Sequence, residues 1–76
     1  MSNTTPQTEQ IEIVVNGETR AIPGAMNVLE LLEFLGIARD RVAIELDGGI
    51  VRKQDWTATA IGPGSKIEIV QFVGGG

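Results

Sequence analysis

One short segment, residues 27–36, constrains the fold more than any other because it carries helix signals at its start, middle and end. Asn27 is a favourable N-cap residue, and Glu30 stands where it can complete a capping box. Gly36 can adopt the left-handed conformation that closes a helix, with Ile37 packing back on the last turn. The apolar residues between these ends follow the spacing of one helix face: Val28, Leu31, Leu32 and Leu35. The sequence therefore predicts one helix with a single face to bury.

Strand patterns lie on both sides of this helix. Before it, residues 11–15 place apolar side chains at alternate positions, and the return strand covers residues 19–22. Between them, Asn16-Gly17 is the strongest short signal for a type I′ hairpin turn. After the helix, residues 42–46 show the same alternation and predict a third strand.

The rest of the chain predicts short elements and a final strand. Asp47-Gly48-Gly49 is expected to turn into a brief strand at 50–52. Residues 53–56 are expected to form one helical turn that brings Trp56 onto the edge of the core. Gly62-Pro63-Gly64 predicts a tight turn rather than a phosphate loop, because no Gly-Lys-Ser/Thr ending follows it. The last strand is predicted at residues 66–73.

The order of these elements limits the topology. A helix between strands of one sheet must bury its apolar face on that sheet, and such crossovers are right-handed. We therefore predict an α+β fold: a mixed sheet of four or five strands with one helix across it, the β-grasp arrangement of ubiquitin-like proteins. Residues 11–73 are assigned to this domain, 74–76 to a flexible glycine tail, and the polar residues 1–10 to a disordered leader.

Charge and composition exclude several partners. The net charge of −4 argues against nucleic acid and anionic membrane surfaces. No apolar run approaches the ~20 residues of a membrane span, and the leader lacks the features of a signal peptide. The absence of cysteine fits the cytoplasm, which is the expected compartment.

The reactive side chains are few. Without His or Cys, the chain has neither the usual nucleophile–base pairs nor a His/Cys zinc site. No spacing places two carboxylates in an apolar cleft. We therefore expect no catalysis by this chain alone, no bound metal and no cofactor of its own.

Two segments resemble one known family. The run from Lys66 to Gly76, KIEIVQFVGGG, resembles the ending of the ThiS family, the bacterial sulfur carriers of thiamine biosynthesis. The segment from Gly49 to Trp56, GIVRKQDW, resembles an internal stretch of the same family, and the resemblance extends over residues 11–76. One difference is that Ser65-Lys66 follows Gly64, where the family usually has Gly-Asp.

The resemblance implies a carrier cycle centred on Gly76. A ubiquitin-activating-type adenylyltransferase would use ATP and Mg²⁺ to convert the Gly76 carboxylate to an acyl adenylate. A persulfide sulfur from a donor enzyme would displace AMP and leave a thiocarboxylate. Thiazole synthase would then receive the sulfur. In this reading the chain is a co-substrate, and Gly74 and Gly75 enter the partner's channel without side chains that clash.

Alternation along the last strand points to a docking surface. If Ile67 and Ile69 face the helix, then Val70 and Phe72 lie on the opposite face, and Val14 is a candidate for the same face. Exposed apolar pairs of this kind often mark interfaces. The alternative, that Phe72 covers the edge of the core, stays open at this point.

Three other functions fit parts of this pattern. A molybdopterin-synthase small subunit shares the fold and the Gly-Gly ending. A ubiquitin-like modifier would use the same terminus to form isopeptide bonds with lysines. A structural module with an idle glycine tail is the remaining alternative.

Overall fold

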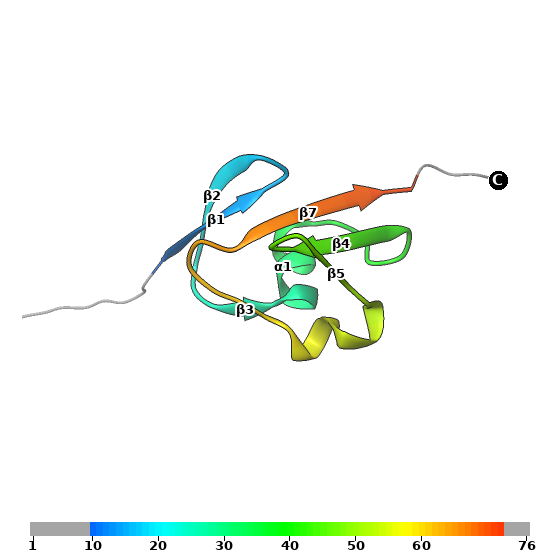
Figure 1. Cartoon of the computed structure of the whole chain (residues 1–76). Coiled ribbons are helices and arrows are strands. Elements are labelled where there is room, and N and C mark those ends of the chain that lie inside the picture. The colour runs from blue at the N-terminus through cyan, green and yellow to red at the C-terminus, as the bar shows by residue number, and fades with distance from the viewer. Residues whose placement is uncertain (1–9, 73–76) are drawn as a thin grey trace, which may run out of the picture.

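The protein is built around a five-stranded mixed sheet in the order β2-β1-β7-β4-β5, with one α-helix across a single face (Figure 1). The computed structural model describes residues 10–72. The sheet strands are β1 (Ile11–Val15), β2 (Glu18–Ile22), β4 (Val42–Leu46), β5 (Gly49–Val51) and β7 (Lys66–Gln71). The predicted α+β fold is confirmed. The leader through residue 9, Val73 and the glycine tail lie outside the described residues.

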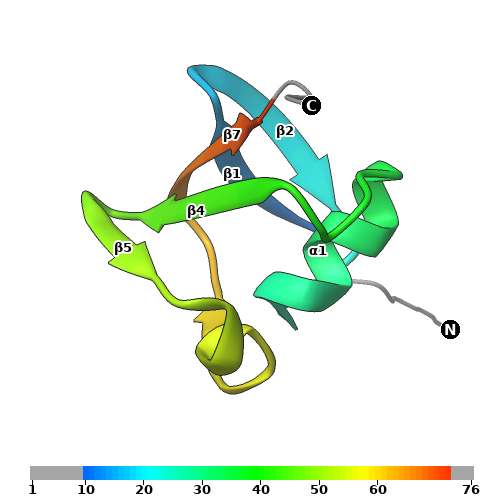
Figure 2. The same cartoon turned by 90° about the vertical axis from the view of Figure 1, so that its right-hand side faces the viewer.

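The last strand, β7, lies in the middle of the sheet. It runs parallel to β1, with Val14 opposite Lys66 and Val15 opposite Ile67. On its other side it runs antiparallel to β4 over a longer stretch, from Leu46 opposite Ile67 to Val42 opposite Gln71. The hairpins β1–β2 and β4–β5 therefore flank β7 (Figure 2). Both of their turns contact it, because the Asn16 N–H donates to the Ile67 carbonyl and the Asp47 N–H to the Lys66 carbonyl.

The helix α1 (Val28–Leu35) begins and ends where the sequence predicts. Oδ1 of Asn27 accepts a hydrogen bond from the Glu30 N–H at 2.8 Å, and Oε1 of Glu30 accepts one from the Asn27 N–H at 2.9 Å. Gly36 ends the helix in the left-handed conformation, with φ 74°. The Ile37 N–H donates to the Leu32 carbonyl at 2.9 Å, which completes a Schellman-type ending.

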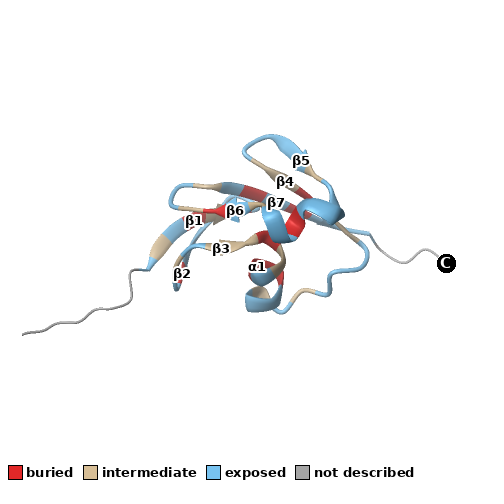
Figure 3. Cartoon of the chain, turned by 90° about the horizontal axis from the view of Figure 1, so that it is seen from below, coloured by how far each residue is buried: buried red, intermediate tan, exposed pale blue. Residues whose placement is uncertain are grey.

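The core lies between α1 and the sheet, where the buried positions of both face each other (Figure 3). β7 contributes Ile67 and Ile69, and its burial alternates as expected for a strand with one buried face. Trp56 is 3% exposed, and its Nε1–H donates to the Val51 carbonyl at 3.0 Å. In the part of the chain that the structure describes, the buried side chains are Ile13, Val15, Ile22, Val28, Leu31, Leu32, Ile44, Trp56, Ile61, Ile67 and Ile69.

Several details differ from the sequence-based expectation. A second sheet pairs β3 (Met26–Asn27) with β6 (Ala60–Ile61), and neither strand was predicted. The single helical turn is a 3-10 helix, η1 (Lys53–Ala58), which carries Trp56 into the core rather than to its edge. Gly49 belongs to β5 and not to the preceding turn.

The turn at Gly62-Pro63-Gly64 is confirmed: the Ser65 N–H donates to the Gly62 carbonyl at 3.1 Å, and Gly64 has φ 80°. Within residues 10–72, α1 and η1 are both too short to cross a membrane.

Candidate functional site

The structure places the segment that leads to the predicted reactive terminus at the end of the central strand. β7 carries the chain through the middle of the sheet and ends at Gln71. The Phe72 N–H then donates to the carbonyl of Arg41, the residue before β4, at 2.8 Å. The hydrogen bonding on this side therefore continues one residue beyond the end of β7. The predicted site residues Gly74, Gly75 and Gly76 lie outside the described residues. The candidate site therefore consists of the described residues that precede them, up to Phe72.

Val70 and Phe72 lie on the sheet face turned away from α1. They alternate with the buried residues Ile67 and Ile69, and their side chains are 52% and 56% exposed. Val70 lies opposite Ala43 of β4, a small residue that leaves the valine side chain uncovered. Phe72 is thus exposed rather than a cover for the core edge. The two side chains form an apolar surface beside the point where the chain leaves the sheet.

Val14 belongs to the same face but not to this apolar surface. It alternates with the buried residues Ile13 and Val15, so its side chain points away from α1. Its partner on β7 is Lys66, four residues before Val70. At about 3.3 Å per residue, that separation is roughly 13 Å along the strand. The apolar surface formed by Val70 and Phe72 therefore does not include Val14.

Sequence reasoning missed Ile50, which at 77% is the most exposed large apolar residue within residues 10–72. It lies on β5 opposite Glu45, and Glu45 in turn lies opposite Glu68 on β7. The sequence signal that could have found it is alternation along β5. Because Val51 is half-buried, the preceding residue, Ile50, must point to the outer face. The outer face thus carries apolar side chains on β5 and β7 with two carboxylates between them.

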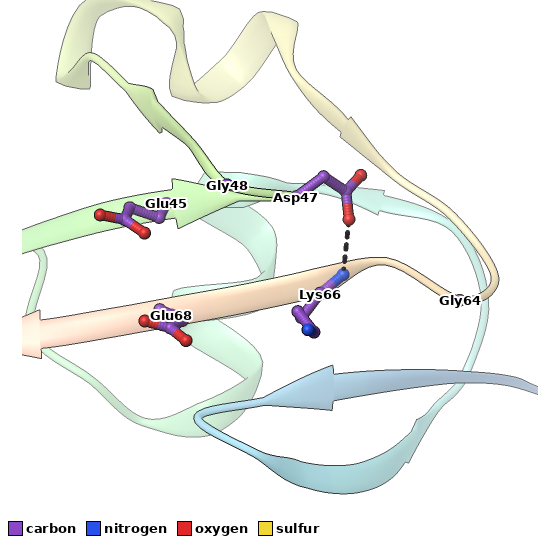
Figure 4. A pocket seen from close by; sticks show the side chains of 6 residues that line it. All are labelled: Glu45, Asp47, Gly48, Gly64, Lys66 and Glu68. Carbon is purple, nitrogen blue, oxygen red and sulfur yellow. Dashed lines mark hydrogen bonds between the residues drawn. The ribbon is translucent and has the colours of Figure 1, made fainter.

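A shallow pocket lies at the start of β7 on the same face (Figure 4). Oδ1 of Asp47 accepts a hydrogen bond from the Lys66 backbone N–H at 2.9 Å. One oxygen of this carboxylate therefore binds the start of β7. Among residues 10–72, no three His, Cys, Asp or Glu side chains are placed to hold a metal ion. The pocket lining is Glu45, Asp47, Gly48, Gly64, Lys66 and Glu68. This lining combines three carboxylates with one lysine.

Other residues considered from the sequence have structural or solvated positions. Glu30 caps α1, Glu33 is exposed on its outer surface, and Arg52 and Lys53 are exposed after β5. The Lys53 ammonium lies 5.8 Å from the centre of the ring of Trp56, which is buried.

Comparison with known proteins gives one consistent result. The model of the ThiS family matches residues 13–76. A thiazole synthase of Paramagnetospirillum magneticum is 41% identical over 66 residues, which are 87% of this chain and 20% of that protein. An uncharacterized protein of Porphyra purpurea, ycf40, is 31% identical over 68 residues, which are 90% of this chain and 96% of that protein.

A solved structure agrees with these sequence matches. The crystal structure of a thiamine biosynthesis protein (ThiS) from Geobacter metallireducens has a TM-score of 0.76 and 33% sequence identity, and the match covers 87% of this chain and 100% of that one. By contrast, the chain spans only about a fifth of the length of the thiazole synthase that it matches.

Proposed function

This chain belongs to the ThiS family, and on that premise we propose that it is a sulfur carrier of thiamine biosynthesis whose reactive group is the Gly76 carboxylate. The observation that carries the proposal is the extent of the family match, which begins in β1 and continues through the three terminal glycines. The chain acts as a co-substrate in the cytoplasm, and its partners supply the catalysis.

The proposed cycle has three steps. An adenylyltransferase of the ubiquitin-activating type uses ATP and Mg²⁺ to join AMP to the Gly76 carboxylate, with release of pyrophosphate. A persulfide sulfur of a donor enzyme then attacks the acyl carbon and displaces AMP, and reductive cleavage of the S–S bond by a thiol leaves a thiocarboxylate. That thiocarboxylate passes its sulfur to thiazole synthase, which incorporates it into the thiazole ring.

The chemistry of the chain fits this division of labour. A terminal carboxylate is ionised at neutral pH and is a poor electrophile, so it needs activation before a sulfur can attack it. The sequence has no His or Cys that would act as base or nucleophile. Gly74, Gly75 and Gly76 have no side chains, which suits passage through a narrow channel to the adenylation site.

Val70 and Phe72 are proposed to bind the partners. Both are apolar, more than half exposed, and placed on the last strand just before the glycines. An exposed aromatic residue next to a reactive terminus is well placed to anchor an interface while the terminus enters the active site. Gly74 and Gly75 are proposed as the part of the interface that lies inside the channel.

The match to a thiazole synthase supports that enzyme as a partner. A stretch similar to this chain makes up a fifth of the Paramagnetospirillum magneticum protein. Two units joined in one chain have a high effective concentration for each other, which favours direct transfer of a reactive group between them. We infer that this chain makes such a transfer to a thiazole synthase.

ATP–pyrophosphate exchange with the activating adenylyltransferase tests the proposal. The full chain is expected to support exchange, whereas a chain with one residue added after Gly76 is not. The added residue moves the carboxylate by up to ~3.6 Å, and a displacement of about 1 Å can lower a rate on the order of a hundredfold. Gly75→Val provides a second variant, because its β-branched side chain restricts the backbone at the channel.

Circular dichroism should show that both variants fold normally. Exchange by the extended chain at the wild-type rate, without prior trimming, would contradict the proposal. Co-purification then separates the alternatives: thiazole synthase supports the thiamine branch, a molybdopterin-synthase large subunit supports the other carrier type, and conjugates with lysines of other proteins indicate a modifier.

A further inference from the structure

Asn16 does more than form a turn, because its side chain bonds the central strand. The residue has φ 50°, and Gly17 after it has φ 84°, so both central positions of the β1–β2 turn have the positive φ of a type I′ turn. Oδ1 of Asn16 accepts a hydrogen bond from the Ile69 N–H at 2.7 Å. Nδ2 donates to the Ile69 carbonyl at 3.2 Å. The backbone N–H of Asn16 donates to the Ile67 carbonyl at 2.9 Å.

The two side-chain hydrogen bonds of Asn16 continue the β1–β7 pairing beyond the point where the backbone of β1 can pair with β7. The parallel pairing of β1 with β7 ends at Val15 opposite Ile67, because β1 turns away at Asn16. Ile69 is 7% exposed, and its N–H and carbonyl point to this edge of β7. The Asn16 amide presents one acceptor and one donor, as a strand residue would, and so satisfies both groups.

A second turn makes a corresponding contact at the first residue of the strand. Asp47 has φ 51° in the β4–β5 turn and precedes Gly48, which has φ 89°. Its Oδ1 accepts from the Lys66 N–H at 2.9 Å, and its own backbone N–H donates to the Lys66 carbonyl at 2.7 Å. The two hairpin turns therefore hold β7 from opposite edges, Asp47 at its first residue, Lys66, and Asn16 at its second and fourth residues, Ile67 and Ile69.

The position of Asn16 links it to the end of β7. Ile69 directly precedes Val70 and lies three residues before Phe72, whereas Lys66 is at the far end of the strand. On the β4 side, regular pairing holds β7 as far as Gln71. On the β1 side, within residues 10–72, the Asn16 side chain provides the last hydrogen bonds to β7, at Ile69.

We propose that Asn16 is a positioning residue: its amide fixes the second half of β7 and thereby the point after Phe72 from which the chain continues toward the partner's active site. The inference rests on the proposed function, which gives the residues after this point their role in that active site. Asp47 makes a similar contact, but at Lys66, the first residue of β7 and the one farthest from Phe72. Its role is therefore confined to the stability of the fold. Because a displacement of about 1 Å can lower a rate on the order of a hundredfold, loosening at Ile69 affects turnover even when the fold persists.

Asn16→Gly and Asp47→Gly form a matched pair of variants. Glycine accepts positive φ at both positions, so each turn is kept while its side-chain hydrogen bonds are removed. Amide hydrogen exchange measured by NMR on the full chain reports each contact separately. Asn16→Gly is expected to speed exchange of the Ile69 N–H by roughly tenfold, the equivalent of one net hydrogen bond, and to leave Lys66 protected. Asp47→Gly is expected to do the reverse.

ATP–pyrophosphate exchange with the activating adenylyltransferase then separates positioning from stability. Asn16→Gly is expected to lower kcat by roughly tenfold, a fraction of the effect of a full 1 Å displacement, with KM for the carrier little changed. Asp47→Gly is expected to keep the wild-type kcat. Equal kcat for the two variants, or unchanged exchange of the Ile69 N–H in Asn16→Gly, would overturn the inference. Failure of the wild-type chain to support any ATP–pyrophosphate exchange would reject the proposed function, and the NMR comparison would still decide whether Asn16 holds this half of β7.

Discussion

Glu45 of β4 and Glu68 of β7 lie directly opposite each other on the outer face of the sheet, so two carboxylates share one cross-strand position (Figure 4). Like charges at such positions destabilise a sheet by about 0.2–1 kcal/mol. Neither side chain is buried, which lets solvent and salt weaken the repulsion. The sheet therefore carries an unfavourable contact beside its most exposed apolar residues.

Glu68→Gln should raise the free energy of unfolding by a few tenths to about 1 kcal/mol, because it removes one of the two charges at nearly constant size. Urea denaturation at low and high salt measures the effect, and the gain should shrink as salt screens the pair. Glu33→Gln is the control, since Glu33 is exposed on α1 rather than in the sheet. A gain of the same size in the control would assign the effect to net charge instead of this pair.

Asn27→Ala should lower the free energy of unfolding by about 1 kcal/mol, within a usual range of about 0.5–2 kcal/mol for loss of an N-cap. The substitution leaves the Glu30 N–H without its acceptor at the start of α1. Asn27→Gly should cost only a few tenths of a kcal/mol, because glycine is itself tolerated at an N-cap. Thermal unfolding of the two variants gives the comparison, and equal losses would show that the cap hydrogen bond contributes little.

Phe72→Ala should weaken binding of the activating adenylyltransferase by roughly 1–3 kcal/mol, as expected for an aromatic anchor. Phe34→Ala is a matched control, because Phe34 is also about half exposed (52%) but lies on α1. Isothermal titration calorimetry should show weaker binding for the first variant and unchanged affinity for the second.

Folding provides a separate check on Phe72. Leu32 is 1% exposed, and Leu32→Ala should cost about 2–5 kcal/mol through the cavity it opens in the core. Phe72→Ala should cost clearly less. If the two substitutions destabilise equally while Phe72→Ala retains full affinity, Phe72 belongs to the core and not to a docking surface.

Local signals account for the parts of the fold that the sequence predicts well. The α1 boundaries follow from Asn27, Glu30 and Gly36, each of which acts on residues within one helical turn. The two positive-φ turns follow from Asn16-Gly17 and Asp47-Gly48 for the same reason. The exposed position of Val70 and Phe72 follows from alternation with Ile67 and Ile69.

Long-range contacts explain what the sequence does not predict. β3 and β6 are two residues each, too short to show a period, and they form because the chain brings Met26 beside Ile61. Ile61 is completely buried for the same reason. The hydrogen bonds between Asn16 and Ile69 join residues 53 positions apart. The Asn-Gly motif therefore predicts the turn but not the hydrogen bonds between this turn and β7.

The intact mass of the full chain tests the central claim most directly. The chain would be incubated with the activating adenylyltransferase, ATP, Mg²⁺, the persulfide donor and a thiol reductant, and then analysed whole and after proteolysis. We predict a mass gain equal to the replacement of one oxygen by one sulfur, located on the peptide that ends at Gly76, and no gain when one residue follows Gly76. An unchanged mass, with an adenylyltransferase shown to be active on another carrier, or a sulfur located elsewhere in the chain, would contradict the account.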